Sequence, residues 1–171
     1  ILLYVKDLTI SFLDGEETEA VRHADFYIKK GESVAVVGES GAGKTTLMRV
    51  CMGLAGKSAK AEGKVFLNFG KEAGFFDICS MERKDRIKQV FGKKIAMVFQ
   101  DPSVCLDPVF TVGNQLLEGI CLKNKVTKKE GRKIAAELLM QAGMEDGERI
   151  LKLYPHQLSG GMRQRIAVLQ A

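Results

Sequence analysis

The feature that most constrains this chain is the stretch GESGAGKTT, residues 38–46. It satisfies the pattern G-x-x-x-x-G-K-[ST] through Gly38, Gly43, Lys44 and Thr45. The apolar run SVAVV precedes it, and residues with helical apolar spacing follow it. A strand, a glycine loop and a helix N-terminus in this order point several backbone N–H groups at one anion. The sequence therefore predicts an α/β fold with a phosphate-binding loop.

The residue types of this loop suit a nucleoside triphosphate bound with a metal ion. Glycines let the backbone curl around the phosphates, and the helix dipole favours negative charge at its N-terminus. Lys44 is expected to reach the β- and γ-phosphates, and the Thr45 hydroxyl is expected to ligate Mg²⁺. Glu39 and Ser40 are expected to shape the loop without taking part in the chemistry. The predicted nucleotide-binding residues are Gly38, Glu39, Ser40, Gly41, Ala42, Gly43, Lys44, Thr45 and Thr46. The alternative is an ordinary glycine-rich turn between a strand and a helix.

The first hundred residues carry mainly strand signals around this loop. Short apolar or alternating runs are typical of strands, and a continuous apolar run is typical of a strand buried on both faces. The predicted strands are 1–12, 20–28, a buried strand at 33–38, 64–69, and a second buried strand at 94–99. The predicted helices are 43–54, with Leu47, Val50, Cys51 and Leu54 on one face, and 80–91, with Ser80 as N-cap. Asp14-Gly15 predicts a hairpin turn.

From residue 111 the apolar spacing becomes helical. The helix over 111–122 is predicted to bury Val112, Leu116, Leu117 and Ile120. A second helix begins at Thr127, which forms a capping box with Glu130 three residues later. Its predicted apolar stripe is Ile134, Leu138 and Ala142, and Gly143 is expected to end it.

The length, charge and cysteine content of the chain limit the kinds of domain and site that it can form, but they do not identify a binding partner. The chain has 171 residues, enough for one domain with a hydrophobic core. Its formal charge of +5 has two interpretations, an anionic partner or an acidic stretch outside this sequence, and the scatter of the basic residues favours the second. The four cysteines form no C-x-x-C pair, so we expect buried or free thiols and no zinc site.

Two further motifs resemble those of ABC-type ATPases. LSGGMRQR (158–165) resembles the signature motif of that family, and Gln100 at the end of KIAMVFQ resembles its Q-loop glutamine. The order of phosphate loop, Q-loop, helices and signature covers nearly the whole chain. FQDPSVCLDPVFTVGNQL (99–116) and YPHQLSGGMRQR (154–165) resemble the ATP-binding subunits of oligopeptide, dipeptide and nickel importers. Cys105 and Asp107 stand where those proteins usually have Ser and Asn.

The resemblance implies a fold and its divisions. It implies an α/β nucleotide-binding domain of the ABC type, a P-loop NTPase with an antiparallel β-subdomain and an α-helical subdomain. Residues 1–100 would form the β-subdomain and P-loop core, 101–157 the helical subdomain, and 158–171 the signature and the start of the next helix. The family continues into the Walker B strand and the catalytic Glu, so we expect an incomplete domain that binds nucleotide and hydrolyses it poorly alone.

The resemblance also implies further site residues. Phe12 would stack on adenine, with Tyr4 as a weaker candidate and a plain core aromatic as the alternative. Gln100 would contact Mg²⁺ together with Thr45. A signature formed by Ser159, Gly160 and Gly161 would contact the ATP of a partner subunit, and the alternative is that Ser159 only caps a helix. His156 precedes the signature and is expected to be structural.

The implied partners are a second ABC ATPase subunit, identical or paralogous, membrane permease subunits and, indirectly, an external substrate-binding protein. The segment 101–123 would dock the permease through Val109, Phe110 and Val112, or these residues would be local core. The implied function is ATP-driven import of peptides or nickel, with ATP and Mg²⁺ as cofactors, from the cytoplasmic face of the membrane and without nucleic acid. The alternatives are a soluble ABC-type ATPase acting on DNA or the ribosome, and a regulatory domain that never hydrolyses nucleotide.

Overall fold

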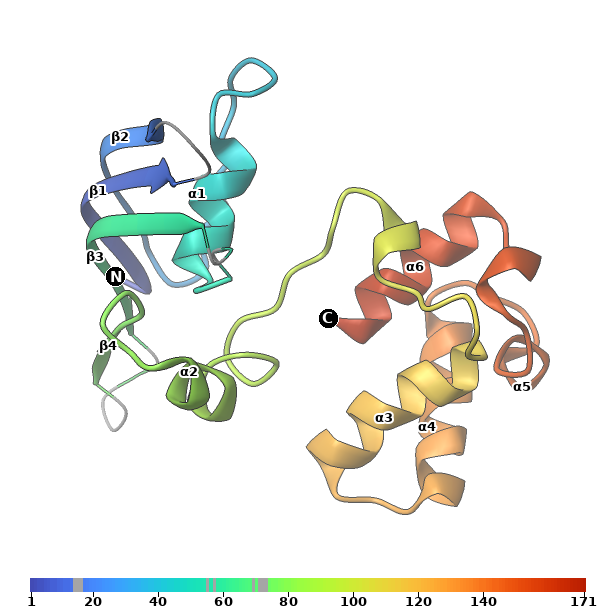
Figure 1. Ribbon diagram of the computed structural model, residues 1–171. Helices are drawn as coiled ribbons and strands as arrows, with labels where there is room; N and C mark the ends of the chain where they lie inside the picture. The colour runs from blue at the N-terminus through green and yellow to red at the C-terminus, as the bar shows by residue number, and fades with distance from the viewer. Residues whose placement is uncertain (14–16, 55, 57, 69, 71–73) are drawn as a thin grey trace. The chain divides into compact units, whose positions relative to one another are not determined.

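The computed structural model describes residues 1–13, 17–54, 56, 58–68, 70 and 74–171, and the predicted Asp14-Gly15 turn lies outside them. The chain divides into two compact units, Ile1–Ile95 and Ala96–Ala171 (Figure 1). The first contains β1 (Leu3–Phe12), β2 (Thr18–Ile28), α1 (Lys44–Cys51), β3 (Ala59–Asn68), β4 (Phe75–Asp77) and α2 (Arg83–Gln89). The second contains η1 (Pro102–Val104), α3 (Val112–Asn124), α4 (Lys128–Gln141), α5 (Gly147–Ile150), η2 (Pro155–Gln157) and α6 (Gly160–Gln170).

The strands of the first unit form one antiparallel sheet in the order β2-β1-β3-β4. The buried hydrophobic residues of β1 are Leu3 and Val5, then Leu8 and Ile10, so the inward hydrophobic face changes from odd to even positions. A bulge causes this change, because Asp7 adopts a positive φ of 49° and the register shifts around it. The predicted strands 1–12 and 20–28 are confirmed as β1 and β2, and the predicted strand 64–69 is confirmed within β3 as far as residue 68, because residue 69 lies outside the described residues. β4 was not predicted.

α1 covers the inner face of this sheet and completes the core of the first unit (Figure 1). Val50 and Cys51 are buried against the strands, and this burial raises the pKa of the Cys51 thiol to about 12. α1 ends earlier than predicted, because the Leu54 N–H donates to the Arg49 carbonyl and the Gly53 N–H donates to the Val50 carbonyl. This pair of bonds is a Schellman motif, and it leaves Leu54 exposed.

Two predicted strands are wrong. Residues 33–38 and 94–99 form no strand, and within the latter only Ile95 makes an isolated bridge, to Phe91. Val37 is 87% exposed and Val98 is 43% exposed. A buried strand needs hydrogen-bonded neighbours at its edges and helices over its faces. Among the described residues no strand pairs with either segment.

The N-terminus of α2 also differs from the prediction. Its N-cap is Glu82, which lacks a side-chain capping bond, and not Ser80. The Ser80 hydroxyl instead donates to the Asp77 carbonyl at 3.0 Å, and the Asp77 carboxylate accepts from the Cys79 N–H at 3.1 Å. Asp77 therefore holds Ser80 in a turn that precedes the helix.

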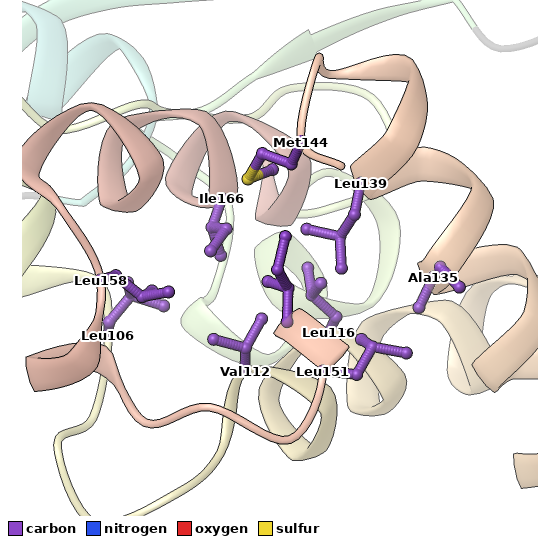
Figure 2. Close-up of a cluster of buried hydrophobic side chains, with 11 residues drawn as sticks. Leu106, Val112, Leu116, Ala135, Leu139, Met144, Leu151, Leu158 and Ile166 are labelled. Carbon is purple, nitrogen blue, oxygen red and sulfur yellow. The ribbon is translucent and has the colours of Figure 1, made fainter. Parts of the chain in front are cut away.

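The helices of the second unit pack around one hydrophobic cluster. Figure 2 shows Val112 and Leu116 of α3, Leu139 of α4 and Ile166 of α6 pointing toward one another. Val112 is fully buried, so of its two predicted alternatives, docking residue or local core, the structure supports local core. The N–H groups of Val112 and Gly113 donate to the carbonyls of Leu153 and Leu151, both at 2.9 Å. These bonds satisfy the N-terminus of α3.

The predicted capping box at the start of α4 is confirmed. The Thr127 hydroxyl accepts from the Glu130 N–H, and the Glu130 carboxylate accepts from the Thr127 N–H at 2.9 Å. The Thr127 hydroxyl also donates to the Glu130 carboxylate at 2.7 Å, and this bond, together with the one from the Thr127 N–H, lowers the pKa of Glu130. Gly143, with φ 73°, follows the C-cap as predicted.

The predicted buried stripe of α4 is shifted. The fully buried face carries Gly131, Ala135, Ala136 and Leu139, whereas the predicted residues Ile134, Leu138 and Ala142 are half-buried. α3 approaches α4 closely at Gly131, where a β-carbon would lie 2.8 Å from the Cys121 sulfur. The centre of this helix contact therefore has small residues, and the larger ones lie beside it.

Within the described parts of the chain, no helix combines the length and hydropathy needed to cross a membrane.

Candidate functional site

The glycine-rich loop before α1 has the backbone that its sequence requires. Gly41 and Gly43 adopt φ values of 84° and 80°, which L residues with side chains rarely adopt. Gly43 is also the N-cap of α1, and a β-carbon there would clash with the Ala20 carbonyl oxygen of β2. This contact fixes the start of α1 against the sheet.

Lys44 lies inside the curve of this loop. Its ammonium group donates to the Gly38 carbonyl at 2.9 Å and to the Glu39 carbonyl. The first turn of α1 contains no acidic residue, and no side chain caps its N-terminus. The first N–H groups of a helix have no partner within the helix, so this end of α1 can donate to an anion.

A hollow of about 390 Å³ lies beside the loop. Residues 19–22 of β2, Val36 and Val37, and the start of α1 line it. Thr45 is exposed and Thr46 is half-buried at the first turn of α1. Of the nine predicted loop residues, Ala42, Gly43 and Lys44 line this hollow, and the other six are not among its lining residues.

The two aromatic candidates lie at opposite ends of β1. Phe12 is half-buried and pairs with Thr18, two residues before the Ala20 carbonyl that contacts Gly43. Tyr4 is roughly 26 Å away along the strand, at about 3.3 Å per residue. Its ring stacks on Phe66 with centroids 6.4 Å apart. Phe12, and not Tyr4, is at the loop end of the sheet.

The predicted signature forms the N-terminus of α6. Ser159 is the N-cap, and its hydroxyl accepts from the Met162 N–H at 3.3 Å. The capping interpretation of Ser159 is confirmed. The first turn of α6 contains no acidic residue, and Ser159, Gly160 and Gly161 are exposed.

Gly160 and Gly161 serve no packing purpose among the described residues. A β-carbon at either position would meet nothing within 4 Å. Gly113 and Gly131 differ, because a β-carbon on either would meet a neighbouring helix or carbonyl. Glycine costs a helix up to about 1 kcal/mol relative to alanine. The space beside both positions is open, as it also is beside Gly119 in α3.

Two residues that the sequence analysis missed hold the signature helix in place. The Gln157 side chain accepts from the Tyr154 N–H at 2.9 Å and fixes the turn before α6. Arg165 donates to the carbonyls of Ala142 and Gly143 at the end of α4, at 3.3 and 2.9 Å. A cation commonly stabilises a helix C-terminus. Arg165 is more than 20 residues from the end of α4 in the sequence, so no local pattern predicts that these two groups meet. The ring of His156 stacks on Tyr154 at 5.7 Å, in keeping with a structural role.

Gln100 and the segment after it belong to the second unit. Gln100 is exposed at a bend before η1. Further on, the Gln115 amide donates to the carbonyls of Asp107 and Phe110 at 2.9 and 3.0 Å, and its oxygen accepts from the Asp107 N–H. This clamp, which the sequence analysis also missed, presents Val109 at 69% and Phe110 at 51% exposure.

Comparison with known proteins identifies the family. The model of a family described as "ABC transporter" matches residues 21–171. The chain belongs to the ABC transporter family. This confirms the predicted recognition and, with the antiparallel sheet, phosphate loop and helical unit, the predicted α/β P-loop fold of the ABC type.

Relatives within this family are peptide transport proteins. The oligopeptide transport ATP-binding protein AppD of Bacillus subtilis is 41% identical over 168 residues, which are 98% of this chain and 50% of AppD. The dipeptide transport ATP-binding protein DppD of the same organism is 41% identical over 172 residues, 99% of this chain and 50% of DppD. The chain thus spans about half the length of the curated relatives it matches.

Among solved structures, a dimeric post-hydrolysis state of the ATP-binding cassette MJ0796 bound to ADP and Pi superimposes with a TM-score of 0.80. That protein is 28% identical, and the match covers 99% of this chain and 68% of the other.

Proposed function

We propose that this chain is the nucleotide-binding part of an ABC importer subunit that, in the whole protein, couples ATP binding and hydrolysis to uptake of peptides. The observation that carries the proposal is Lys44, whose ammonium lies inside the glycine loop at the uncapped N-terminus of α1. Similarity over nearly the whole chain to oligopeptide and dipeptide transport ATP-binding proteins supports the substrate class. Nickel, the other predicted substrate, depends on the sequence resemblance alone.

The loop suits the triphosphate of ATP. Lys44 donates here to neutral carbonyls, and a phosphate oxygen would be a stronger acceptor because it is charged. The N–H groups at the start of α1 would donate to the same oxygens. Phe12, at the loop end of β1, is the residue we assign to the adenine.

For Mg²⁺ we assign the side-chain oxygen of Thr45, which is exposed at the first turn of α1. Mg²⁺ takes hard oxygen ligands and keeps several waters, so a neutral protein oxygen beside phosphates suits it. Gln100, the other predicted Mg²⁺ ligand, belongs to the second unit, and its assignment depends on the sequence resemblance alone. Bound Mg²⁺ would neutralise charge on the phosphate oxygens during transfer.

The signature and the Gln115 clamp are assigned to protein partners. Ser159, Gly160 and Gly161 would contact the phosphates bound by a second ABC ATPase subunit, which the exposed, uncompensated glycines support. Val109 and Phe110 would contact a permease subunit and hold the protein at the cytoplasmic face of the membrane. A substrate-binding protein would act on it only through the permease.

The other two functions are less well supported. The peptide-transport names of the relatives do not favour an ATPase that acts on DNA or the ribosome. ATP turnover by the whole protein would exclude a regulatory domain that never hydrolyses nucleotide.

Calorimetry with Mg²⁺-ATP on the chain and on Lys44→Ala tests the proposal. Lys60→Ala is the matched control, because Lys60 is an exposed lysine of the same unit whose partner is Glu62 on β3. Hydrogen bonds to charged groups contribute about 1.5–3 kcal/mol, so Lys44→Ala should lower the affinity roughly 10- to 150-fold. The control should bind like the unaltered chain. Equal binding by Lys44→Ala would overturn the assignment of the loop.

A further inference from the structure

A charged pair borders the hollow beside the phosphate loop. Arg22 and Glu19 of β2 both line it, and the Arg22 Nε lies 2.7 Å from a Glu19 carboxylate oxygen. Their side chains are 74% and 45% exposed. Ala20 and Val21, between them in sequence, approach the Gly43 position most closely. Arg22 and Glu19 therefore lie on β2 beside the point where the phosphate loop meets that strand.

The charges around the hollow are few. Among the described residues that line it, Lys44 and Arg22 are cationic, Glu19 is anionic, and the rest are neutral. Lys44 donates to carbonyls of the loop itself. Arg22 is thus the second cation available to an anion that enters this space.

Arg22 can leave Glu19 for another anion at little cost in stability. An exposed ion pair contributes little to stability, because water and salt compete for both groups. A guanidinium group matches two phosphate oxygens at once, and charge-assisted bonds of this kind are strong. A triphosphate carries more negative charge than one carboxylate, so it would compete effectively for Arg22.

We propose that Arg22 is a phosphate-binding residue of this site and that Glu19 holds it, as a competing ligand, until a triphosphate binds. The inference depends on the proposed function, because it takes a nucleoside triphosphate as the ligand. In this proposal the Arg22 guanidinium contacts the phosphate groups of the nucleotide and does not contact its nucleobase.

The test is a thermodynamic cycle of Mg²⁺-ATP affinity on the full chain. Arg22→Gln should weaken binding about three- to tenfold, less than Lys44→Ala, because the Arg22 side chain is exposed and must first leave Glu19. Glu19→Gln should tighten binding about two- to fivefold by releasing Arg22, and the double variant should bind like Arg22→Gln. Lys60→Gln, which removes a similar charge from a 2.7 Å ion pair on β3, is the control for net charge.

Several outcomes would overturn the proposal. Arg22→Gln binding within twofold of the unaltered chain would do so, as would an equal loss in Lys60→Gln. A gain from Glu19→Gln that persists without Arg22 would show a general charge effect. If Lys44→Ala loses binding while Arg22→Gln does not, only this inference fails; if Lys44→Ala binds normally, the proposed function fails.

Tripolyphosphate in place of ATP identifies the contacted group. The proposal predicts the same loss of affinity in Arg22→Gln for tripolyphosphate as for ATP. A loss for ATP alone would assign Arg22 to the nucleoside and contradict the proposal.

Discussion

Replacing Gly160 and Gly161 together by alanine should stabilise this chain. Neither added β-carbon meets an atom within 4 Å, so helix propensity dominates the change. Glycine costs up to about 1 kcal/mol in a helix interior, and we expect about half of that at each of these first positions. The gain of about 1 kcal/mol for the pair should raise Tm by about 2–4 °C for a chain of this size. Urea and thermal unfolding followed by circular dichroism at 222 nm measure it.

Gly131→Ala is the matched comparison. Its β-carbon would lie 2.8 Å from the Cys121 sulfur and 3.1 Å from a Leu117 methyl, so it should destabilise the chain by about 1–3 kcal/mol. If the Gly160/Gly161 variant lost as much stability as Gly131→Ala, Gly160 and Gly161 would be required for packing. That result would contradict the proposal that a partner's phosphates approach the backbone at the start of α6. In the whole protein, the same variant should lose nucleotide-dependent dimerisation.

Three further predictions concern single residues. The hydrogen bond that the His23 ring donates to the Asp7 carboxylate, with the charges of Asp7, Glu19 and Asp25, raises the pKa of His23. The stabilising contribution of His23 should therefore be complete in acid and decline as pH rises through that raised pKa. An NMR titration should show the raised pKa, and Asp7→Asn should lower it. Arg165→Gln should destabilise the second unit by about 1–2 kcal/mol, measured by urea unfolding, because it removes charged donors from the end of α4. Val37→Thr should change the free energy of unfolding by less than about 0.5 kcal/mol, whereas Val65→Ala in the core should cost about 2 kcal/mol or more; equal effects in thermal unfolding would mean that Val37 is buried in solution.

Local signals in the sequence predicted local structure well. The Thr127–Glu130 capping box needs only residues three apart, and the structure contains it. The left-handed glycines of the phosphate loop follow from the same short-range rules. The functional role of that loop stays a prediction until nucleotide binding is measured.

The wrong predictions concern features that depend on contacts between residues far apart in the sequence. The apolar runs at 33–38 and 94–99 predict buried strands, but whether such a run becomes a strand depends on neighbours that local sequence does not reveal. The stripe of α4 was displaced because the closest approach of α3 selects small residues such as Ala135 over large ones. The Arg22–Glu19 pair and the Gln115 clamp depend on side-chain placement, which no periodicity encodes.

The claim that residues 38–46 hold a triphosphate is tested most directly by ¹H–¹⁵N NMR of the chain during titration with Mg²⁺-ATP. The amide signals of Gly41, Gly43, Thr45 and Thr46 should shift most, because the loop and the start of α1 would donate to the phosphates. Amides of α4 are the internal reference and should stay unchanged. Shifts confined to other segments, or unchanged loop signals at saturating nucleotide, would contradict the account.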